Sequence, residues 1–145
     1  MIALIQRVNR ASVSVDGEIV GAIGRGILAL IGVEKTDVER DAERLAERIL
    51  GYRVFPDPEG KMNLSLGDTG GGLLLVPQFT LAADTRKGTR PSFSSAAAPE
   101  LATALFERLV AGARARHRQV ETGRFGAEMI VSLENHGPVT LWLTS

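Results

Sequence analysis

Apolar and polar residues alternate in short runs over the first quarter of the chain, and such alternation is typical of half-buried β-strands. The pattern predicts strands at residues 2–8, 12–15 and 18–23. Asp16-Gly17 lies between the last two and is a strong signal for a tight hairpin turn. An unbroken apolar run then predicts a further strand at 27–33.

The spacing of apolar residues changes to that of a helix after residue 35. Thr36 and Glu39 have the spacing of a capping box, in which two side chains bond to free backbone amides at a helix start. The helix that follows is predicted to be amphipathic and to end before Gly51, because its apolar residues return at helical intervals: Val38, Ala42, Leu45, Ala46, Ile49 and Leu50. A second helix is predicted from Pro99 to about Arg116.

The remaining apolar runs predict more strands. Residues 52–55 are expected to be extended, and a buried strand is expected at 73–76. Residues 129–133 and 139–143 are predicted to form a closing pair of strands around 135–138. Many strands with two separated main helices indicate a single α+β domain, residues 1–145, with a mostly antiparallel or mixed sheet.

Composition narrows the class of protein. The 145 residues are enough for one buried core, 44% of them are hydrophobic, and the formal net charge is zero. A disordered tail protein is therefore excluded, and so is broad, non-specific nucleic-acid binding through a basic face. The longest apolar run, 27–31, is too short to cross a bilayer, and the first residues do not have the pattern of a secretion signal. We expect a cytoplasmic protein without a membrane partner.

The side chains that usually carry out hydrolysis are scarce. The chain has no cysteine, and its two histidines, His117 and His136, show neither metal-ligand spacing nor a recognisable pairing with a serine. We therefore expect no metal, no cofactor and no serine triad. The glycines of 21–26 are in the wrong order for a dinucleotide loop, and they lead into a strand instead of a helix.

Two short motifs remain as candidates for a site. Gln78-Phe79-Thr80-Leu81 follows Pro77 directly after a predicted strand, and Asn135-His136-Gly137-Pro138-Val139-Thr140 contains a Gly-Pro step. Proline cannot donate to a sheet ladder, so both places free main-chain groups, and free amides can stabilise an oxyanion.

The side chains of the first motif allow more than one role. A threonine nucleophile needs a base, and none is near Thr80 in the sequence, so local hydrogen bonding in a strand or a positioning role is favoured over attack by its hydroxyl. Gln78 does not titrate, but its amide can orient water or substrate.

The two motifs and their neighbours resemble those of the D-aminoacyl-tRNA deacylases, and the resemblance covers essentially the whole chain. It also includes residues 1–8, 51–55, 61–64, 90–93 and 122–125. The resemblance implies a curled, barrel-like sheet in a homodimer. It implies a hydrolase that cleaves the ester between a D-amino acid and the 3′-terminal adenosine of tRNA and so serves as a proofreading enzyme of translation. A pocket that only excludes an L side chain should admit glycine, so we also predict action on glycyl-tRNA mischarged on tRNA(Ala).

The resemblance also implies roles for particular residues. The backbone N–H of Phe79, with Gln78 and Thr80 beside it, corresponds to an oxyanion contact. Gly137-Pro138 corresponds to a cis step that reaches into the partner's pocket and fills the space of an L side chain, and Arg7 helps to hold it. Phe125 and Met129 match positions near the terminal adenosine and the pocket. Water is then the nucleophile, and the 2′-hydroxyl of the substrate orients or activates it.

One residue departs from the family pattern. Pro77 stands where the family usually has serine, so a hydroxyl and an N–H are missing. Two alternatives therefore stay open: a non-catalytic module that binds the end of tRNA, and a small-ester hydrolase that uses Thr80.

Two basic clusters are open to interpretation. Arg86, Lys87 and Arg90 form the first, in a loop beside the Gln78 motif, where contact with tRNA and a solvated loop are about equally favoured. The second cluster crowds the end of the second helix, where cations are favoured by the helix dipole alone: Arg114, Arg116, His117 and Arg118.

Overall fold

The computed structural model describes all 145 residues and is organised around one long strand, β1 (Ile2–Val15). The first half of β1 pairs with β3 (Gly26–Gly32) and its second half with β2 (Glu18–Ile23), both antiparallel. β8 (Ile130–Thr144) runs antiparallel along the other side of β1. β3 continues the sheet to β6 (Gly72–Pro77), and β6 to β7 (Val120–Thr122), both in parallel, so the sheet is mixed.

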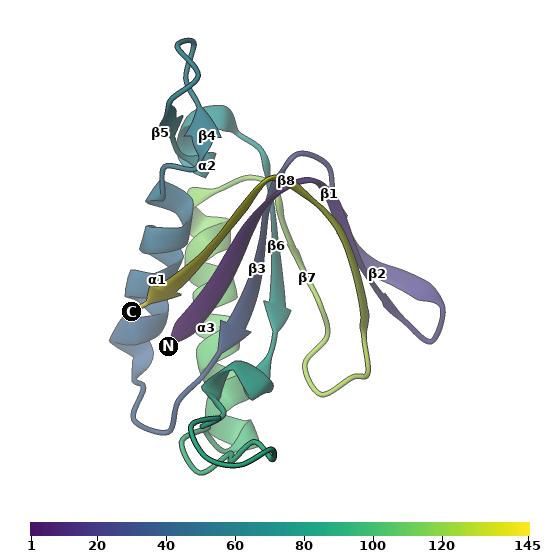
Figure 1. Cartoon of the computed structure of the whole chain (residues 1–145), viewed down its shortest axis with the longest axis vertical. Coiled ribbons are helices and arrows are strands. Elements are labelled where there is room, and N and C mark those ends of the chain that lie inside the picture. Colours follow the sequence, from purple (N-terminus) through teal and green to yellow (C-terminus); the bar gives the residue numbers. More distant parts are fainter.

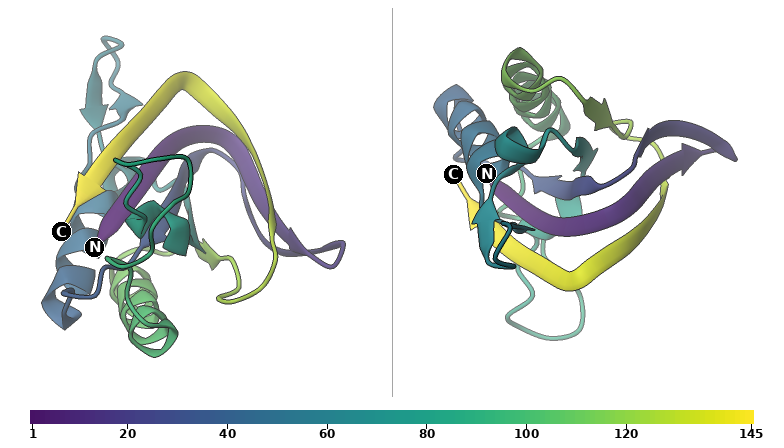
Figure 2. Two further views of the ribbon diagram at one scale, coloured as in Figure 1. Left: turned by 60° about the horizontal axis from the view of Figure 1, so that its bottom comes forward. Right: turned by 90° about the horizontal axis from the view of Figure 1, so that it is seen from above.

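The sheet curls into a nearly closed barrel because β1 and β8 bend together (Figures 1 and 2). On the inside of the curl β2 approaches β7 closely: a Cβ added to Gly21 would lie 2.6 Å from the carbonyl oxygen of Thr122. The expectation of an α+β domain with a curled, mixed sheet is confirmed.

Three helices accompany the sheet. α1 (Glu39–Gly51) and α3 (Pro99–Arg116) are the two predicted helices, and both lie on the same side of the sheet (Figure 2). The short α2 (Leu66–Thr69) was not predicted, and a two-stranded ribbon, β4 (Phe55–Pro56) with β5 (Met62–Leu64), precedes it. A single 3₁₀ turn, η1 (Phe79–Ala82), follows β6. None of the helices combines the length and apolar character needed to cross a membrane.

Apolar side chains are buried on both faces of the sheet. The larger cluster, 25 buried residues, fills the space between the sheet and the two long helices and includes Leu45, Ile49 and Leu109. The smaller cluster, 7 buried residues, lies within the curl and includes Val13 and Leu74. The amphipathic pattern of α1 is explained by the first cluster, and the unbroken apolar run of β3 by burial on both faces.

Two strand predictions were wrong in the same way. Residues 2–8 and 12–15 belong to one continuous β1, and the proposed closing pair, 129–133 and 139–143, belongs to one continuous β8. The two halves of β8 do not pair with each other, because each pairs with its own half of β1. The polar residues that had suggested breaks lie where the register between β1 and β8 shifts, so both strands continue through them. The hairpin at Asp16-Gly17 is confirmed, with positive φ at both residues.

The predicted start of α1 was also wrong in detail. The N-cap residue is Val38, and its N–H donates to the Asp41 carboxylate at 2.9 Å, which lowers the pKa of Asp41. The predicted pair, Thr36 and Glu39, does not form the capping box, because Glu39 is the first residue of the helix and not the third. Asp37, just before the N-cap, is buried and accepts from the Met1 amine and from the Glu34 N–H, both at 2.6 Å.

The closest backbone approach in the sheet lies at Gly26 and Gly72, which face each other across β3 and β6. A Cβ added to Gly26 would lie 1.8 Å from the carbonyl oxygen of Gly72. Gly24, two residues earlier, has no atom within 4 Å of the same added Cβ. Packing thus explains Gly21 and Gly26, whereas nothing in the structure requires glycine at position 24.

We expect Gly26→Ala to lower the free energy of unfolding by about 3 kcal/mol or more, because the methyl group would force two paired backbones apart. Gly24→Ala is the matched control and should leave stability within about 1 kcal/mol of the original chain. Urea denaturation followed by circular dichroism measures both. Equal stability of the two variants would contradict the packing explanation.

Candidate functional site

A cavity of about 650 Å³ opens beside η1 at one end of the sheet. Its walls come from the end of β6, from η1, from the start of α3 and from the loop between β7 and β8. The lining is mostly apolar: Pro77, Phe79, Phe93, Ala96, Ala97, Ala98, Pro99, Ala102, Phe125, Gly126, Ala127 and Met129. No residue of this lining titrates near neutral pH, so the lining side chains supply contact surface and no acid or base.

η1 is positioned by the strand that precedes it. Pro77 ends β6, since proline has no N–H for the ladder. The Gln78 N–H then donates to the Ile31 carbonyl at 2.7 Å, which fixes the turn to β3. Gly32 leaves room for the turn, because a Cβ there would lie 2.9 Å from that of Leu81. Thr80 is therefore in a 3₁₀ turn, and its interpretation as a strand residue was wrong.

The first amides of η1 are free donors. The amides of Leu81 and Ala83 bond to Gln78 and Thr80 carbonyls, whereas no turn or loop hydrogen bond uses the N–H of Phe79 or Thr80. Free amides at a helix start are expected, and here they belong to the residue whose ring lines the cavity and to its neighbour. The Gln78 side-chain amide donates to the Thr80 hydroxyl, so both side chains are held together.

The opposite wall is formed by the loop that follows β7. Gly123 permits this loop to lie close to β6, because a Cβ there would lie 3.3 Å from the Val76 side chain and 2.9 Å from the Met129 sulfur. The Arg124 N–H donates to the same sulfur at 3.3 Å. Phe125 packs against Phe106, with ring centroids 6.4 Å apart. The structure thus brings Phe79, Phe125 and Met129 into one cavity.

Phe93 is a site residue that sequence reasoning missed. Its ring centroid lies 5.1 Å from that of Phe79, and both rings are strongly exposed, at 41% and 58%. Two exposed aromatic rings in contact are unusual unless something covers them. The sequence signals were a phenylalanine within a polar loop and its place in 90–93, a segment of the family resemblance to which no role was assigned.

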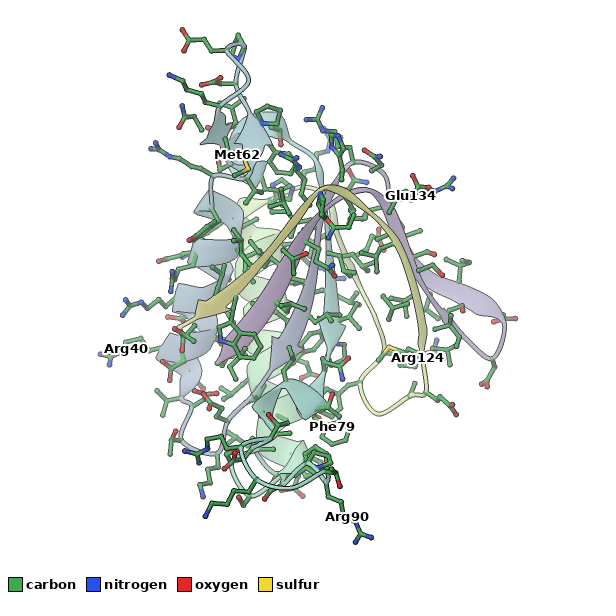
Figure 3. The ribbon with its side chains drawn as sticks, viewed as in Figure 1. Arg40, Met62, Phe79, Arg90, Arg124 and Glu134 are labelled. Carbon is green, nitrogen blue, oxygen red and sulfur yellow. The ribbon has the colours of Figure 1, made fainter.

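The basic loop beside the site is a closed structure. Asp84 and Ser92 exchange backbone hydrogen bonds at 2.8 and 3.0 Å and close the loop at its base. The Arg86 guanidinium donates to both carboxylate oxygens of Asp84, which holds the pKa of that carboxyl well below its usual range. Lys87 and Arg90 make no ion pair, and Figure 3 shows Arg90 at the same end of the molecule as Phe79.

The second motif forms a bulge within β8, called the projecting loop below. Opposite it on β1, Gln6 and Val8 pair with Thr140 and Asn135, so residues 136–139 project from the ladder. Asn135 fixes the base of this loop, because its side chain accepts from the Val139 N–H at 3.0 Å and donates to the Thr140 hydroxyl at 2.8 Å.

Arg7 holds the loop from beneath. It donates to the His136 carbonyl at 2.9 Å and to the Val54 carbonyl at 2.7 Å. The Gly137–Pro138 peptide is cis, both residues are exposed, and φ of Gly137 is 134°, a value that favours glycine. His136 contributes its carbonyl, with no part for its ring.

The two motifs lie at opposite ends of the sheet. Arg7 is paired with Ile27 at one end of β3, whereas Gln78 bonds to Ile31 near the other end. Figure 3 agrees: Phe79 lies low in the view, and Glu134, which precedes the projecting loop, lies high. Within one chain, therefore, Gly137-Pro138 and Arg7 do not line the cavity that contains Phe79, Phe125 and Met129.

Metal-binding side chains are not gathered anywhere in the chain: no group of three or more His, Asp or Glu residues could hold an ion. His117 bonds through Nε2 to the Gly71 carbonyl at 2.6 Å, which links the end of α3 to the start of β6.

The chain is similar to known proteins over nearly its whole length. A family model described as D-Tyr-tRNA(Tyr) deacylase matches residues 4–144. A D-aminoacyl-tRNA deacylase of Thioalkalivibrio sulfidiphilus is 68% identical over 143 residues, which cover 99% of this chain and 96% of that relative. A protein of the same name from Teredinibacter turnerae is 63% identical over 145 residues, which cover 100% of both.

Solved structures have the same fold. One, described as c-Myc DNA Unwinding Element Binding Protein, superposes with a TM-score of 0.96 at 40% identity and covers 100% of this chain and 99% of its own. Another, described as a probable eukaryotic D-amino acid tRNA deacylase, has a TM-score of 0.84 at 19% identity, with 98% of this chain and 97% of its own covered. At that identity the second likeness concerns the fold alone.

Proposed function

This chain belongs to the D-Tyr-tRNA(Tyr) deacylase family and is a hydrolase that acts on D-aminoacyl-tRNA, and from that premise we propose that the cavity beside η1 is where it cleaves its substrate. The bond cleaved is the ester between the amino acid and the terminal ribose, and the products are the D-amino acid and free tRNA. The observation that carries the proposal is the pair of free amides, on Phe79 and Thr80, at the edge of an apolar cavity.

The cavity suits the end of an aminoacyl-tRNA. Its volume of about 650 Å³ is within the range of small-ligand sites, roughly 300–1,000 Å³. The exposed rings of Phe79 and Phe93 offer faces on which a base or an aromatic amino acid can stack. Phe125 and Met129 cover the opposite wall and complete the contact surface for the terminal adenosine.

Hydrolysis in this cavity relies on the backbone and the substrate. The ester carbonyl oxygen accepts from the Phe79 and Thr80 amides, which stabilise the negative charge that develops when water attacks the carbonyl carbon. The lining provides no side-chain base. The 2′-hydroxyl beside the ester therefore orients the attacking water, and Gln78 and Thr80 position the reacting groups through their mutual hydrogen bond.

Selectivity for the D form comes from the second motif of a partner subunit. The exposed Gly137-Pro138 loop is held by Arg7 and Asn135, so it is a rigid projection and not a free loop. It lies far from the cavity of its own chain, which supports a role in the cavity of another copy. There its main-chain atoms would occupy the space of an L side chain and leave the D side open.

A homodimer is supported by the exposed surface of β8. This strand pairs with β1 on one side only, so its other edge keeps free backbone groups. Three large apolar side chains on it are exposed: Ile130 at 66%, Leu133 at 37% and Trp142 at 54%. A second copy on this strand would cover them and bring the two projecting loops to the two cavities, in the cytoplasm where charged tRNA is used.

Matched D- and L-tyrosyl-tRNA test the activity directly, and only the D substrate should be hydrolysed. Glycyl-tRNA should also be hydrolysed measurably, including glycine mischarged on tRNA(Ala), whereas L-alanyl-tRNA should not. Attractive contacts to one methyl group are worth only about 1–3 kcal/mol, so larger discrimination requires a clash with fixed backbone.

Arg7→Ala extends this test, because it frees the backbone that causes the clash. It should weaken rejection of L-alanyl-tRNA more than it slows D-substrate cleavage, and Arg10→Ala, at an exposed ion pair with Glu134, serves as the control. Slower cleavage of the D substrate with no gain of activity on L-alanyl-tRNA would show that Arg7 supports the fold in general.

The proposed water attack makes a second prediction. Thr80→Ala should keep substantial turnover, whereas a substrate that ends in 2′-deoxyadenosine should react more slowly by about 10²–10⁴-fold, the usual contribution of proton transfer by a positioned group. Single-turnover release of the amino acid measures both rates. Loss of turnover in Thr80→Ala, with normal cleavage of the deoxy substrate, would make Thr80 the nucleophile.

The dimer makes a third prediction. Trp142→Glu places a charge on the exposed apolar surface of β8, so the variant should sediment as a monomer. Its activity should fall in proportion to the fraction of dimer lost. Ile19→Glu is the matched control, since Ile19 is 63% exposed on β2 and outside the proposed interface. A fully active monomer would overturn the proposal that the partner completes the site.

A further inference from the structure

A second cavity adjoins the first and shares the Phe125 side chain with it. It has a volume of about 470 Å³ and lies between the last turns of α3 and the segment that follows β7. Phe106 and Val110 provide an apolar floor beneath Phe125, and Thr122 and the Gly123 backbone provide polar groups. The two cavities therefore lie on either side of one aromatic side chain.

The charge of the second cavity is mainly positive. Arg114 from α3 and Arg124 from the loop both line it, and neither makes an ion pair. Glu107 is the one carboxylate in the lining. Two arginines of the basic cluster at the end of α3 therefore differ in role. Arg116 forms an ion pair with Glu47 at 2.9 Å and joins the two long helices, whereas Arg114 has no ion-pair partner and is free to bind a ligand.

A phosphodiester is the group that fits these features, given that the proposed function is correct. The substrate is a polynucleotide whose terminal adenosine is joined, through a few bonds from the ester, to the preceding phosphate and nucleotide. Two unpaired arginines suit a phosphate, which guanidinium groups bind with two parallel hydrogen bonds. The apolar floor with an aromatic edge suits a base or a ribose.

We propose that this cavity binds the phosphate and nucleotide that precede the terminal adenosine, with Arg114 and Arg124 as the phosphate ligands. It is a substrate-binding extension of the hydrolytic site and takes no part in the reaction itself. The alternative place for this phosphate is the basic loop, where Lys87 and Arg90 are also unpaired. The lining there has no aromatic ring, so it suits a stacked nucleotide less well.

Two small substrates separate these possibilities: the D-tyrosyl ester of adenosine, and the D-tyrosyl ester of the dinucleotide cytidylyl-adenosine, which adds one phosphodiester. The wild-type chain should have a higher kcat/KM for the dinucleotide ester, through a lower KM. In Arg114→Gln and in Arg124→Gln the ratio of kcat/KM between the two esters should fall about tenfold, as expected for loss of a charged hydrogen bond. In the same variants, the slope of log kcat/KM for the dinucleotide ester against log salt concentration should become less steep by about 0.7–1.

Arg118→Gln is the matched control, because Arg118 belongs to the same basic cluster but does not line the cavity. It should leave the ratio unchanged. The inference is overturned if Arg114→Gln and Arg124→Gln leave the ratio unchanged, or if Lys87→Gln or Arg90→Gln abolishes the advantage of the dinucleotide instead. If the wild-type chain hydrolyses neither ester nor D-tyrosyl-tRNA, the proposed function itself fails, and the inference with it.

Discussion

Close contact between backbones is the constraint on which the rest of this structure depends. Gly26 and Gly72 let the backbones of β3 and β6 lie side by side, and Gly21 lets β2 meet the backbone of β7. Each contact leaves no room for a methyl group. The Gly123 N–H donates to the Leu75 carbonyl at 2.9 Å and so ties the loop after β7 to the backbone of β6. Together they close the curl of the sheet and bring the loop that carries Phe125 against the end of β6, where η1 begins. The cavity is therefore a product of how tightly the strands approach, before any side chain in it is considered.

The site divides its tasks between two kinds of structure. Binding surface comes from apolar and aromatic side chains, whose rings gather at one end of the sheet. The polar groups proposed to act on the ester are main-chain amides, fixed because Gln78 is bonded to β3. The projecting loop at the other end is likewise fixed by main-chain carbonyls, two of which accept from Arg7. Both motifs are held by hydrogen bonds to the sheet: Gln78 bonds to Ile31 of β3, and His136 accepts from Arg7 of β1.

The sequence was most informative where structure is local. Helical spacing located both long helices, and Asp16-Gly17 located its hairpin, because each depends on neighbours a few residues away. It failed where distant segments decide. β1 and β8 run through polar positions because each supplies the other with a partner along most of its length. Phe93 is brought to the cavity by a loop closed at Asp84 and Ser92, a contact that no spacing pattern contains.

The proposed use of main-chain amides in η1 has a consequence for how this site can evolve. An amide N–H is supplied by every amino acid except proline, so drift at positions 79 and 80 can alter the wall of the cavity without deleting the donors. Selection on these two positions then acts on shape and on the tendency to form the turn, and only weakly on chemical identity. Pro77 illustrates the point, since a residue without an N–H is tolerated there at the end of a strand, two residues before the first donor. The side chains at these two positions can therefore change while the hydrogen-bond donors proposed for the reaction are kept.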